Sequence, residues 1–260
     1  MIDLHNDLIT YKNLTANEKR EEIKKDLGDG AFVCYALFLH GKNKEYLNTF
    51  SWAKEYKYLS IEDVGGLEDF SDILSFSPRY ITLTWNEENR YGGGAFSDAD
   101  LKDEGRAMIK SANIENIAID LSHLNRKTFY SAIDIAERVL VSHTCCDKLR
   151  RHKRNLTDDQ IRKVIEKNGV VGLTFVSDFI SANSKASVDD IVAHIDYFCS
   201  KFSFRNLAIG TDFFGTDNGV DGINGYLDFY KIINKLERIG YSSGVIEDIM
   251  TKNAERFLSD

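Results

Sequence analysis

Eight short stretches of the chain are rich in β-branched, aromatic and leucine residues and lack a strict alternation of apolar and polar positions. This pattern is typical of strands that are buried on both faces, as in a parallel sheet. The predicted strands are residues 2–5, 31–38, 57–62, 80–85, 116–122, 139–143, 170–175 and 206–212.

The segments between these runs carry helix and loop signals. Thr157 and Gln160 have the spacing of a capping box, and apolar residues follow at helical period. Segments 187–198 and 227–236 also have the periodicity of amphipathic helices. The glycines at 92–94 predict a mobile loop after the fourth strand.

Alternation of eight strands with helices predicts an α/β fold, a (β/α)8 TIM barrel built as one domain over residues 1–260. A doubly wound open sheet is the alternative, because closure of a sheet is not visible in a sequence.

Composition narrows the class of protein. Hydrophobic residues make up 43% and charged residues 28% of the 260 positions, which is typical of a globular chain. The formal net charge of -8 argues against a general binder of nucleic acid or anionic membranes. The four cysteines form no C-x-x-C pattern, so we expect reduced thiols. Neither a signal-peptide pattern nor a bilayer-length apolar stretch is visible, and we expect a cytoplasmic protein.

Acidic and imidazole side chains fall at the carboxyl ends of several predicted strands. A carboxylate or an imidazole beside a buried strand is costly unless it is paired or binds a metal. In a parallel barrel these strand ends meet at one rim, which predicts a metal site there. The side chains are His5, Asp7, Glu62, His123, His143 and Asp212.

The spacing of the histidines supports this prediction. His5 and Asp7 are two positions apart, so in a strand both point to the same side. His123 and His143 are twenty positions apart, which fits one step around a barrel. Taken alone, the His5 and Asp7 pair fits a turn about as well as a metal site, and either His123 or His143 is better explained as a core or helix-capping residue. Together with Glu62 they form a donor set that suits zinc or a similar divalent ion better than calcium or magnesium.

Two carboxylates have a chemical interpretation beside an ordinary one. Glu62 is either an exposed acid at a strand end or a carboxylate that bridges two metal ions, which lie about 3.5–4 Å apart in such sites. Asp212 is either a helix N-cap or a base held near a metal-bound water. A closed barrel favours the second interpretation of Asp212, because the eighth strand then lies beside the first, which carries His5.

A basic run at residues 150–154 stands out in this acidic protein. Such a run is usually a solvated face, but it follows His143 on the expected active-site side. A guanidinium there is suited to bind a substrate carboxylate through two hydrogen bonds. Among the other histidines, His152 and His40 are expected at the surface, and His194 is expected to have a structural role on a helix.

The chain resembles the membrane (renal) dipeptidase family, peptidase family M19, and in particular its soluble bacterial members. The similar segments occur in the family's order along nearly the whole chain. They are 2–8 (IDLHNDL), 59–62 (LSIE), 80–86 (YITLTWN), 119–124 (IDLSHL), 141–143 (VSH), 152–158 (HKRNLTD), 169–172 (GVVG), 210–212 (GTD) and 253–256 (NAER).

The resemblance implies a barrel of the metal-dependent hydrolase type with two Zn²⁺ ions at the carboxyl ends of the strands. It implies that His5 and Asp7 hold one ion, that His123 and His143 hold the other, and that Glu62 bridges them.

The resemblance also implies a reaction, in which a metal-bridging hydroxide attacks the peptide carbonyl of a dipeptide. Asp212 orients that hydroxide and passes its proton to the leaving amine. Arg154 matches the family arginine that binds the free C-terminal carboxylate of the dipeptide. The resemblance further suggests a homodimer.

Three departures from the family pattern concern the substrate rather than the metal site. Trp85 stands where many members have a histidine that helps to bind the scissile carbonyl oxygen, and Asn86 is placed to assist. Val176 stands where members have a tyrosine. The segment between His5 and Glu62 is short.

Two other functions therefore stay open beside a zinc dipeptidase. One is a related metal-dependent hydrolase of another amide, a lactam or an ester. The other is a metal-binding barrel that has lost catalysis.

Overall fold

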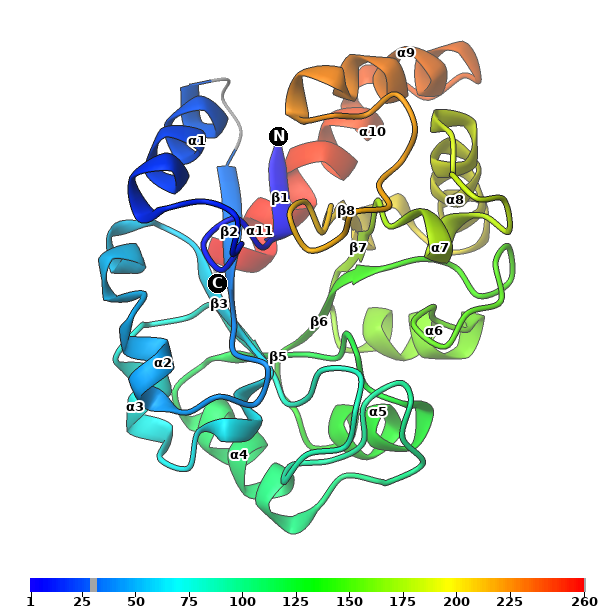
Figure 1. Cartoon of the computed structure of the whole chain (residues 1–260). Coiled ribbons are helices and arrows are strands. Elements are labelled where there is room, and N and C mark those ends of the chain that lie inside the picture. The colour runs from blue at the N-terminus through cyan, green and yellow to red at the C-terminus, as the bar shows by residue number, and fades with distance from the viewer. Residues whose placement is uncertain (29–31, 260) are drawn as a thin grey trace.

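A computed structural model describes residues 1–28 and 32–259 and shows a closed barrel of eight parallel strands, which pair in chain order (Figure 1). The strands are β1 (Ile2–Asn6), β2 (Phe32–Phe38), β3 (Leu59–Glu62), β4 (Tyr80–Thr82), β5 (Ala118–Asp120), β6 (Val139–Thr144), β7 (Val171–Leu173) and β8 (Leu207–Ile209).

Helices follow the strands and surround the barrel (Figure 1). The α-helices are α1 (Ala16–Gly28), α2 (Lys44–Asn48), α3 (Phe70–Leu74), α4 (Asp103–Ile114), α5 (Arg126–Ile133), α6 (Asp158–Glu166), α7 (Ser177–Ile180), α8 (Val188–Lys201), α9 (Tyr230–Arg238), α10 (Ser243–Glu247) and α11 (Asn253–Ser259). Short 3-10 turns lie at Ser51–Glu55, Val64–Gly66, Phe204–Asn206 and Tyr226–Phe229, and a π-helical turn, Asp248–Lys252, precedes α11.

The predicted (β/α)8 barrel is confirmed, and the open-sheet alternative is wrong because β1 pairs with β8 through Asp3 and Ile209. All eight predicted strands are present, although most are shorter than predicted. The predicted eighth strand ends too late, since Asp212 has a φ of 63° and no extended strand contains this left-handed backbone. Residue 31, the predicted start of the second strand, lies outside the described residues.

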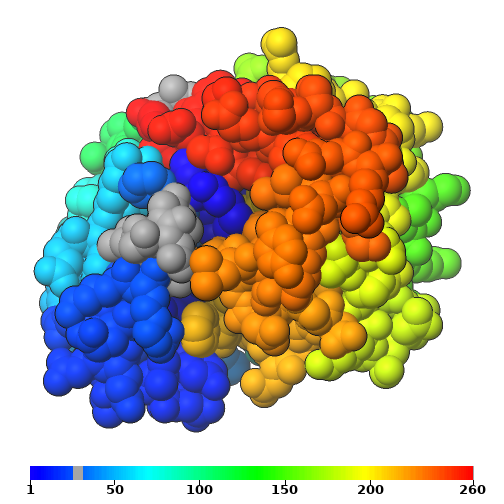
Figure 2. All heavy atoms as spheres, turned by 90° about the horizontal axis from the view of Figure 1, so that it is seen from above, coloured from blue at the N-terminus to red at the C-terminus, as the bar shows by residue number. Residues whose placement is uncertain are grey.

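Both ends of the described chain lie on the same side of the barrel. The C-terminal helix α11 contacts β1 and β8, and Asn253 at its start donates side-chain hydrogen bonds to the carbonyls of Phe204 and Leu207. Viewed from above, the orange and red C-terminal segments lie against two sides of the deep-blue N-terminal residues (Figure 2). These contacts hold β1, which carries His5, in place.

The helix signals of the sequence are confirmed. Thr157 and Gln160 form the predicted capping box at the start of α6. Ser187 caps α8 in the same way, and the helix then runs to Lys201. The predicted helix at 227–236 begins as the 3-10 turn and continues as α9.

The glycines at 92–94 lie in a loop after β4, as the sequence predicts, and close packing explains why they are glycines. They are buried, and Gly93 and Gly94 form isolated β-bridges with Glu88 and Leu124. A Cβ on Gly94 would collide with the backbone of Trp85 and Asn86. Glycine at position 94 therefore allows two backbone segments to approach closely.

The four cysteines are free thiols, as predicted. Within the described part of the chain, none of the helices is long and apolar enough to cross a membrane.

Candidate metal centre

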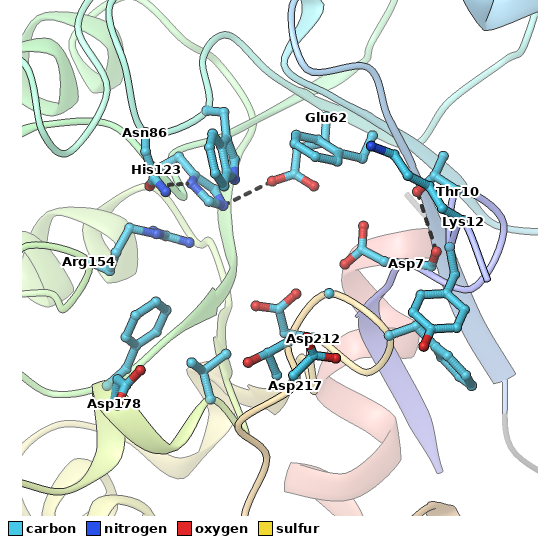
Figure 3. Close-up of a pocket in the computed structure, with 18 of the residues that line it drawn as sticks. Asp7, Thr10, Lys12, Glu62, Asn86, His123, Arg154, Asp178, Asp212 and Asp217 are labelled. Atoms are coloured by element: carbon cyan, nitrogen blue, oxygen red, sulfur yellow. Dashed lines mark hydrogen bonds and ion pairs between the residues drawn. The ribbon is translucent and has the colours of Figure 1, made fainter. Parts of the chain in front are cut away.

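The six candidate side chains converge at the carboxyl ends of the strands. A cavity of about 630 Å³ opens there, and Asp7, Glu62, His123 and Asp212 line it. Figure 3 shows these side chains pointing toward a common centre. His5 and His143 lie beneath them and are almost fully buried. The barrel thus brings together residues from β1, β3, β6 and the loops after β1, β5 and β8.

His5 occupies the middle of the cluster. Its Nε2 atom lies 3.3 Å from Glu62 Oε2 and 3.4 Å from Asp7 Oδ2. These separations exceed the roughly 2.7–2.9 Å of a charge-assisted hydrogen bond. Nε2 is buried and forms no hydrogen bond of good geometry within the described residues. The ligand atoms of His5, Glu62 and His143 lie within 4.8 Å of one another, as do those of His5, Asp7 and Asp212.

The second half of the cluster joins His123 to Glu62 and His143. His123 Nε2 is 2.9 Å from Glu62 Oε1 and 2.8 Å from His143 Nε2. The other ring nitrogen of His123, Nδ1, lies 2.9 Å from the side-chain oxygen of Asn86 and donates to it. In the neutral ring, Nε2 is then a bare acceptor that faces a carboxylate oxygen. An acceptor facing an acceptor at this distance fits a site for a cation, and this donor set suits zinc.

The electrostatics of the cluster agree with this geometry. Burial lowers the pKa of His123 to about 3, with a further contribution from the Arg154 charge. Burial and the charges of His5 and Arg154 also hold the pKa of His143 well below its usual value. Burial opposes ionisation of Glu62, but His5 and His123 outweigh it and lower its pKa. At neutral pH, His123 and His143 are therefore neutral imidazoles and Glu62 is a carboxylate, which are the forms that bind metal. His5 differs, because the effect of burial is outweighed by the charges of Asp7 and Glu62, which raise its pKa well above the usual value. A metal ion bound there would take the place of its proton.

Asp212 reaches the cluster from the loop after β8. Its left-handed backbone is held by an N–H donated to the carbonyl of His5 at 3.0 Å. Desolvation and the nearby Asp7 carboxylate raise the pKa of Asp212 well above its usual value. A carboxyl group with a raised pKa is suited to accept and return a proton near neutral pH.

Arg154 enters the cavity from the side opposite Asp7 (Figure 3). The side chain is only 5% exposed, and its Nε and Nη2 atoms have no hydrogen-bond partner among the described residues. Burial lowers the pKa of Arg154 to about 10, so the guanidinium is still a cation at neutral pH. The guanidinium carbon lies 5.4 Å from the centre of the Phe179 ring. A buried cation with unpaired donors is a site for an anion.

The remaining predicted residues are placed as follows. Trp85, Asn86 and Val176 line the same cavity as Arg154. The ring of Trp85 is 6.1 Å from that of His123.

The histidines predicted outside the site are also outside it in the structure. His40 is exposed, and its ring is 5.2 Å from that of Trp85. His152 is half-buried rather than fully at the surface, because it stacks on Phe179. His194 has the predicted structural role, since it bridges the backbone of Cys146 and Ile180.

Sequence reasoning missed two buried aspartates beneath the site. Asp3 accepts hydrogen bonds from the backbone N–H groups of His5 and Thr211 and from the hydroxyls of Thr211 and Tyr226. Asp120 accepts from Ser142 on the next strand. Both interrupt apolar runs in the sequence, and a buried carboxylate there signals a hydrogen-bonding role.

Comparison with known proteins gives the family. Residues 60–260 match the family model described as membrane dipeptidase (peptidase family M19). The chain belongs to this family. A dipeptidase of Schizosaccharomyces pombe is 31% identical over 192 residues, which cover 70% of this chain and 46% of that protein. A Klebsiella pneumoniae protein encoded in the pqqA 5' region is 30% identical over 217 residues, covering 77% of this chain and 80% of that protein. The chain thus spans less than half of the fungal relative.

Solved structures of metallopeptidases share the fold. A dipeptidase assigned to family M19 superposes with a TM-score of 0.86 at 18% identity, covering 99% of this chain and 97% of that one. A metallopeptidase of Rhodobacter sphaeroides, solved with a phosphinate mimic of the dipeptide L-Ala-D-Ala, gives a TM-score of 0.85 at 16% identity and covers 99% of this chain and 98% of its own.

Proposed function

We propose that this M19 family member is a zinc-dependent dipeptidase that holds two Zn²⁺ ions and hydrolyses dipeptides with a free C-terminal carboxylate. One observation carries the proposal. A cluster of facing acceptors around Glu62 shares a single cavity with the unpaired guanidinium of Arg154. The cluster supplies a place for cations, and the guanidinium supplies a place for a carboxylate.

The ligands divide into two sets around Glu62. His5 and Asp7 would hold one ion, His123 and His143 would hold the other, and the two oxygens of Glu62 would each face one of them. This division follows the distances, since Oε2 lies toward His5 and Oε1 toward His123. When bound, a pair of divalent ions lowers the pKa of a water molecule and polarises a carbonyl group.

Arg154 would orient the substrate. Its Nε and Nη2 donors match the two oxygens of a carboxylate, so the C-terminal end of a dipeptide would lie against Arg154. The scissile carbonyl would then face Glu62 and His123 across the cavity. The cavity volume of about 630 Å³ suits a small molecule, which favours dipeptides over longer peptides.

Asp212 would move the proton. Its carboxylate would take a proton from the attacking water and deliver it to the leaving amine as the C–N bond breaks. The raised pKa of Asp212 fits this exchange, because it makes the carboxylate a better proton acceptor than an ordinary aspartate.

The proposal is tested by hydrolysis of L-Ala-D-Ala and L-Ala-L-Ala, each beside its C-terminally amidated form. The L-D pair is included because the Rhodobacter sphaeroides protein was solved with a mimic of that dipeptide. We expect turnover of the free dipeptides, loss of turnover after chelation, and recovery with zinc. Failure of the zinc-restored protein to hydrolyse any dipeptide would contradict the proposal. If the protein instead prefers another amide, a lactam or an ester, the result would favour the alternative function, a related metal-dependent hydrolase.

The remaining sequence predictions stay predictions. They are the cytoplasmic location, the homodimer, and the extent of the domain over residues 1–260.

A further inference from the structure

A buried chain of hydrogen bonds runs from β5 to two imidazoles of the proposed metal centre. Asp120, at the end of β5, accepts the backbone N–H groups of Ser122 and Ser142 through Oδ1, at 3.0 Å and 2.9 Å. Its Oδ2 accepts the hydroxyl of Ser142 at 2.5 Å. Asp120 and Ser142 are both fully buried. The single hydroxyl proton of Ser142 is therefore committed to Asp120.

This commitment determines what Ser142 offers to its other neighbours. Ser142 Oγ lies 2.7 Å from His143 Nδ1 and 3.4 Å from His5 Nδ1. Since the hydroxyl proton points at Asp120, the oxygen presents only lone pairs to these rings. His143 must then carry its hydrogen on Nδ1. The Nε2 atom of a neutral His143 is left without hydrogen, on the side that faces His123.

We propose that Asp120 and Ser142 are positioning residues that hold His143 in the Nδ1–H tautomer and so keep its Nε2 open to a divalent ion. The inference rests on the proposed function only for the identity of that ion. Ser142 also contacts His5, so one hydroxyl serves an imidazole from each of the two ligand sets. Such outer partners fix ring orientation and tautomer in metal sites.

The direction of the hydrogen bond between Ser142 and His143 distinguishes this role from simple structural support. In Asp120→Asn, the amide oxygen still accepts the two backbone N–H groups, while the amide nitrogen takes the place of Oδ2. That nitrogen donates to Ser142, whose own proton then turns to the nearest of its other neighbours, His143 Nδ1 at 2.7 Å, in preference to Ser122 Oγ at 3.3 Å. The size of the side chain is unchanged, yet the hydrogen-bond chain is reversed. His143 becomes protonated on Nε2 and loses its free lone pair toward the metal site.

Asp3 provides the matched control. It is a second fully buried aspartate, and it also accepts two backbone N–H groups and hydroxyls. Its hydrogen-bond partners in the described part of the chain are the backbone of His5 and groups of Thr211 and Tyr226, and no imidazole ring is among them. Asp3→Asn therefore makes the same chemical change in similar surroundings without reversing a bond to a histidine ring.

The experiment measures the tautomer directly in the full-length, metal-free protein. Long-range ¹H–¹⁵N NMR spectra of protein labelled at histidine identify which ring nitrogen of His143 carries hydrogen. Zinc affinity is measured on the same samples by competition with a chelator. We expect Nδ1–H for His143 in the wild type and in Asp3→Asn, and Nε2–H in Asp120→Asn. We expect zinc affinity to fall by about 10–100-fold in Asp120→Asn relative to the Asp3→Asn control.

A second variant tests whether the effect of Asp120 reaches His143 through the hydroxyl group of Ser142. Ser142→Ala breaks the chain, so adding Asp120→Asn to it should leave the His143 tautomer as it is in Ser142→Ala alone. The inference is overturned if wild-type His143 carries hydrogen on Nε2, or if Asp120→Asn leaves its tautomer unchanged. These results are distinguishable from a failure of the proposed function. If the wild type binds zinc and hydrolyses dipeptides while Asp120→Asn leaves the His143 tautomer unchanged, the proposed function stands and this inference is overturned.

Discussion

His123 Nε2 and Glu62 Oε1 lie 2.9 Å apart, although the bond from His123 Nδ1 to Asn86 makes both atoms acceptors in the neutral site. Two facing acceptors repel unless a cation lies between them or a proton is taken up. The two facing acceptors therefore form a place that a divalent ion would fill. This relationship makes Glu62 the residue whose chemistry is tested most easily.

Glu62→Gln removes the charge and one acceptor without changing the size of the side chain. The amide is able to donate to His123 Nε2, so we expect the metal-free variant to fold at least as stably as the wild type. We expect metal retention to weaken and turnover to be lost, because an amide does not bridge two cations as a carboxylate does. Elemental analysis, thermal unfolding and dipeptide hydrolysis measure these effects, with Glu87→Gln at an exposed position as the control. Unchanged activity would remove Glu62 from the centre.

Arg154→Ala tests the proposed carboxylate site. We expect KM for dipeptides with a free carboxylate to rise roughly tenfold or more, since truncating one partner of a buried charge pair costs about 2–5 kcal/mol. Amidated dipeptides should be affected much less. Arg151→Ala is the matched control, because Arg151 belongs to the same basic run but is exposed. An equal loss on free and amidated substrates would contradict the assignment of Arg154.

Gly215→Ala tests how closely the loop after β8 packs on the two carboxylates. A Cβ on Gly215 would collide with the carboxylate oxygens of Asp212 and Asp7. These side chains are able to rotate away, so we expect little change in unfolding temperature but a loss of about 100-fold in kcat/KM from misplaced groups. Gly219→Ala, in the same loop, meets open space and should behave as the wild type. Equal activities of the two variants would show that the packing at Gly215 does not matter.

His194 makes stability depend on pH. Burial lowers its pKa below the usual value, so the folded protein keeps the ring neutral while the unfolded chain takes up a proton below pH about 6.5. The stability that His194 contributes is present above that pH and is lost as the pH falls toward the lowered folded pKa, by at most about 1.4 kcal/mol per pH unit.

His194→Gln keeps a side-chain acceptor and donor for the backbone of Cys146 and Ile180 but does not titrate. We therefore expect the free energy of unfolding of the metal-free variant to fall less steeply than that of the wild type between about pH 7 and 5. The other histidines are the same in both proteins, so the difference in slope belongs to His194. Denaturant unfolding across this range measures it, and parallel curves would contradict the expected role.

The barrel and the convergence of the candidate residues were predictable because strand order and strand ends leave direct marks in a sequence. Eight apolar runs separated by amphipathic segments indicate the sheet, and the polar residues that end the runs must then meet at one rim. The basic run at 150–154 stood out by its position after His143, and the resemblance to the family singled out Arg154 within it. The unpaired donors of Arg154 became visible only in three dimensions.

Other features were hidden because they depend on contacts between distant segments. The glycines at 92–94 look like a flexible loop in the sequence, yet neighbouring backbone leaves no room for a Cβ at two of them: that of Ala99 at Gly93, and that of Trp85 and Asn86 at Gly94. Asp120 is one polar residue in an apolar run, and its link to His143 passes through Ser142 on a different strand. Left-handed backbone at Asp212 shortened the predicted eighth strand, and although aspartate adopts this conformation more often than most residues, its identity does not show where it does so.

The central claim is a two-ion centre that hydrolyses dipeptides, and its most direct test is metal content measured on an active sample. The full-length protein is purified without chelator, reconstituted with zinc, and divided between elemental analysis and an L-Ala-D-Ala hydrolysis assay. The account predicts about two zinc ions per chain, with turnover rising as the ions are restored. Absence of bound metal after reconstitution, or two bound ions without turnover of any dipeptide, would contradict it.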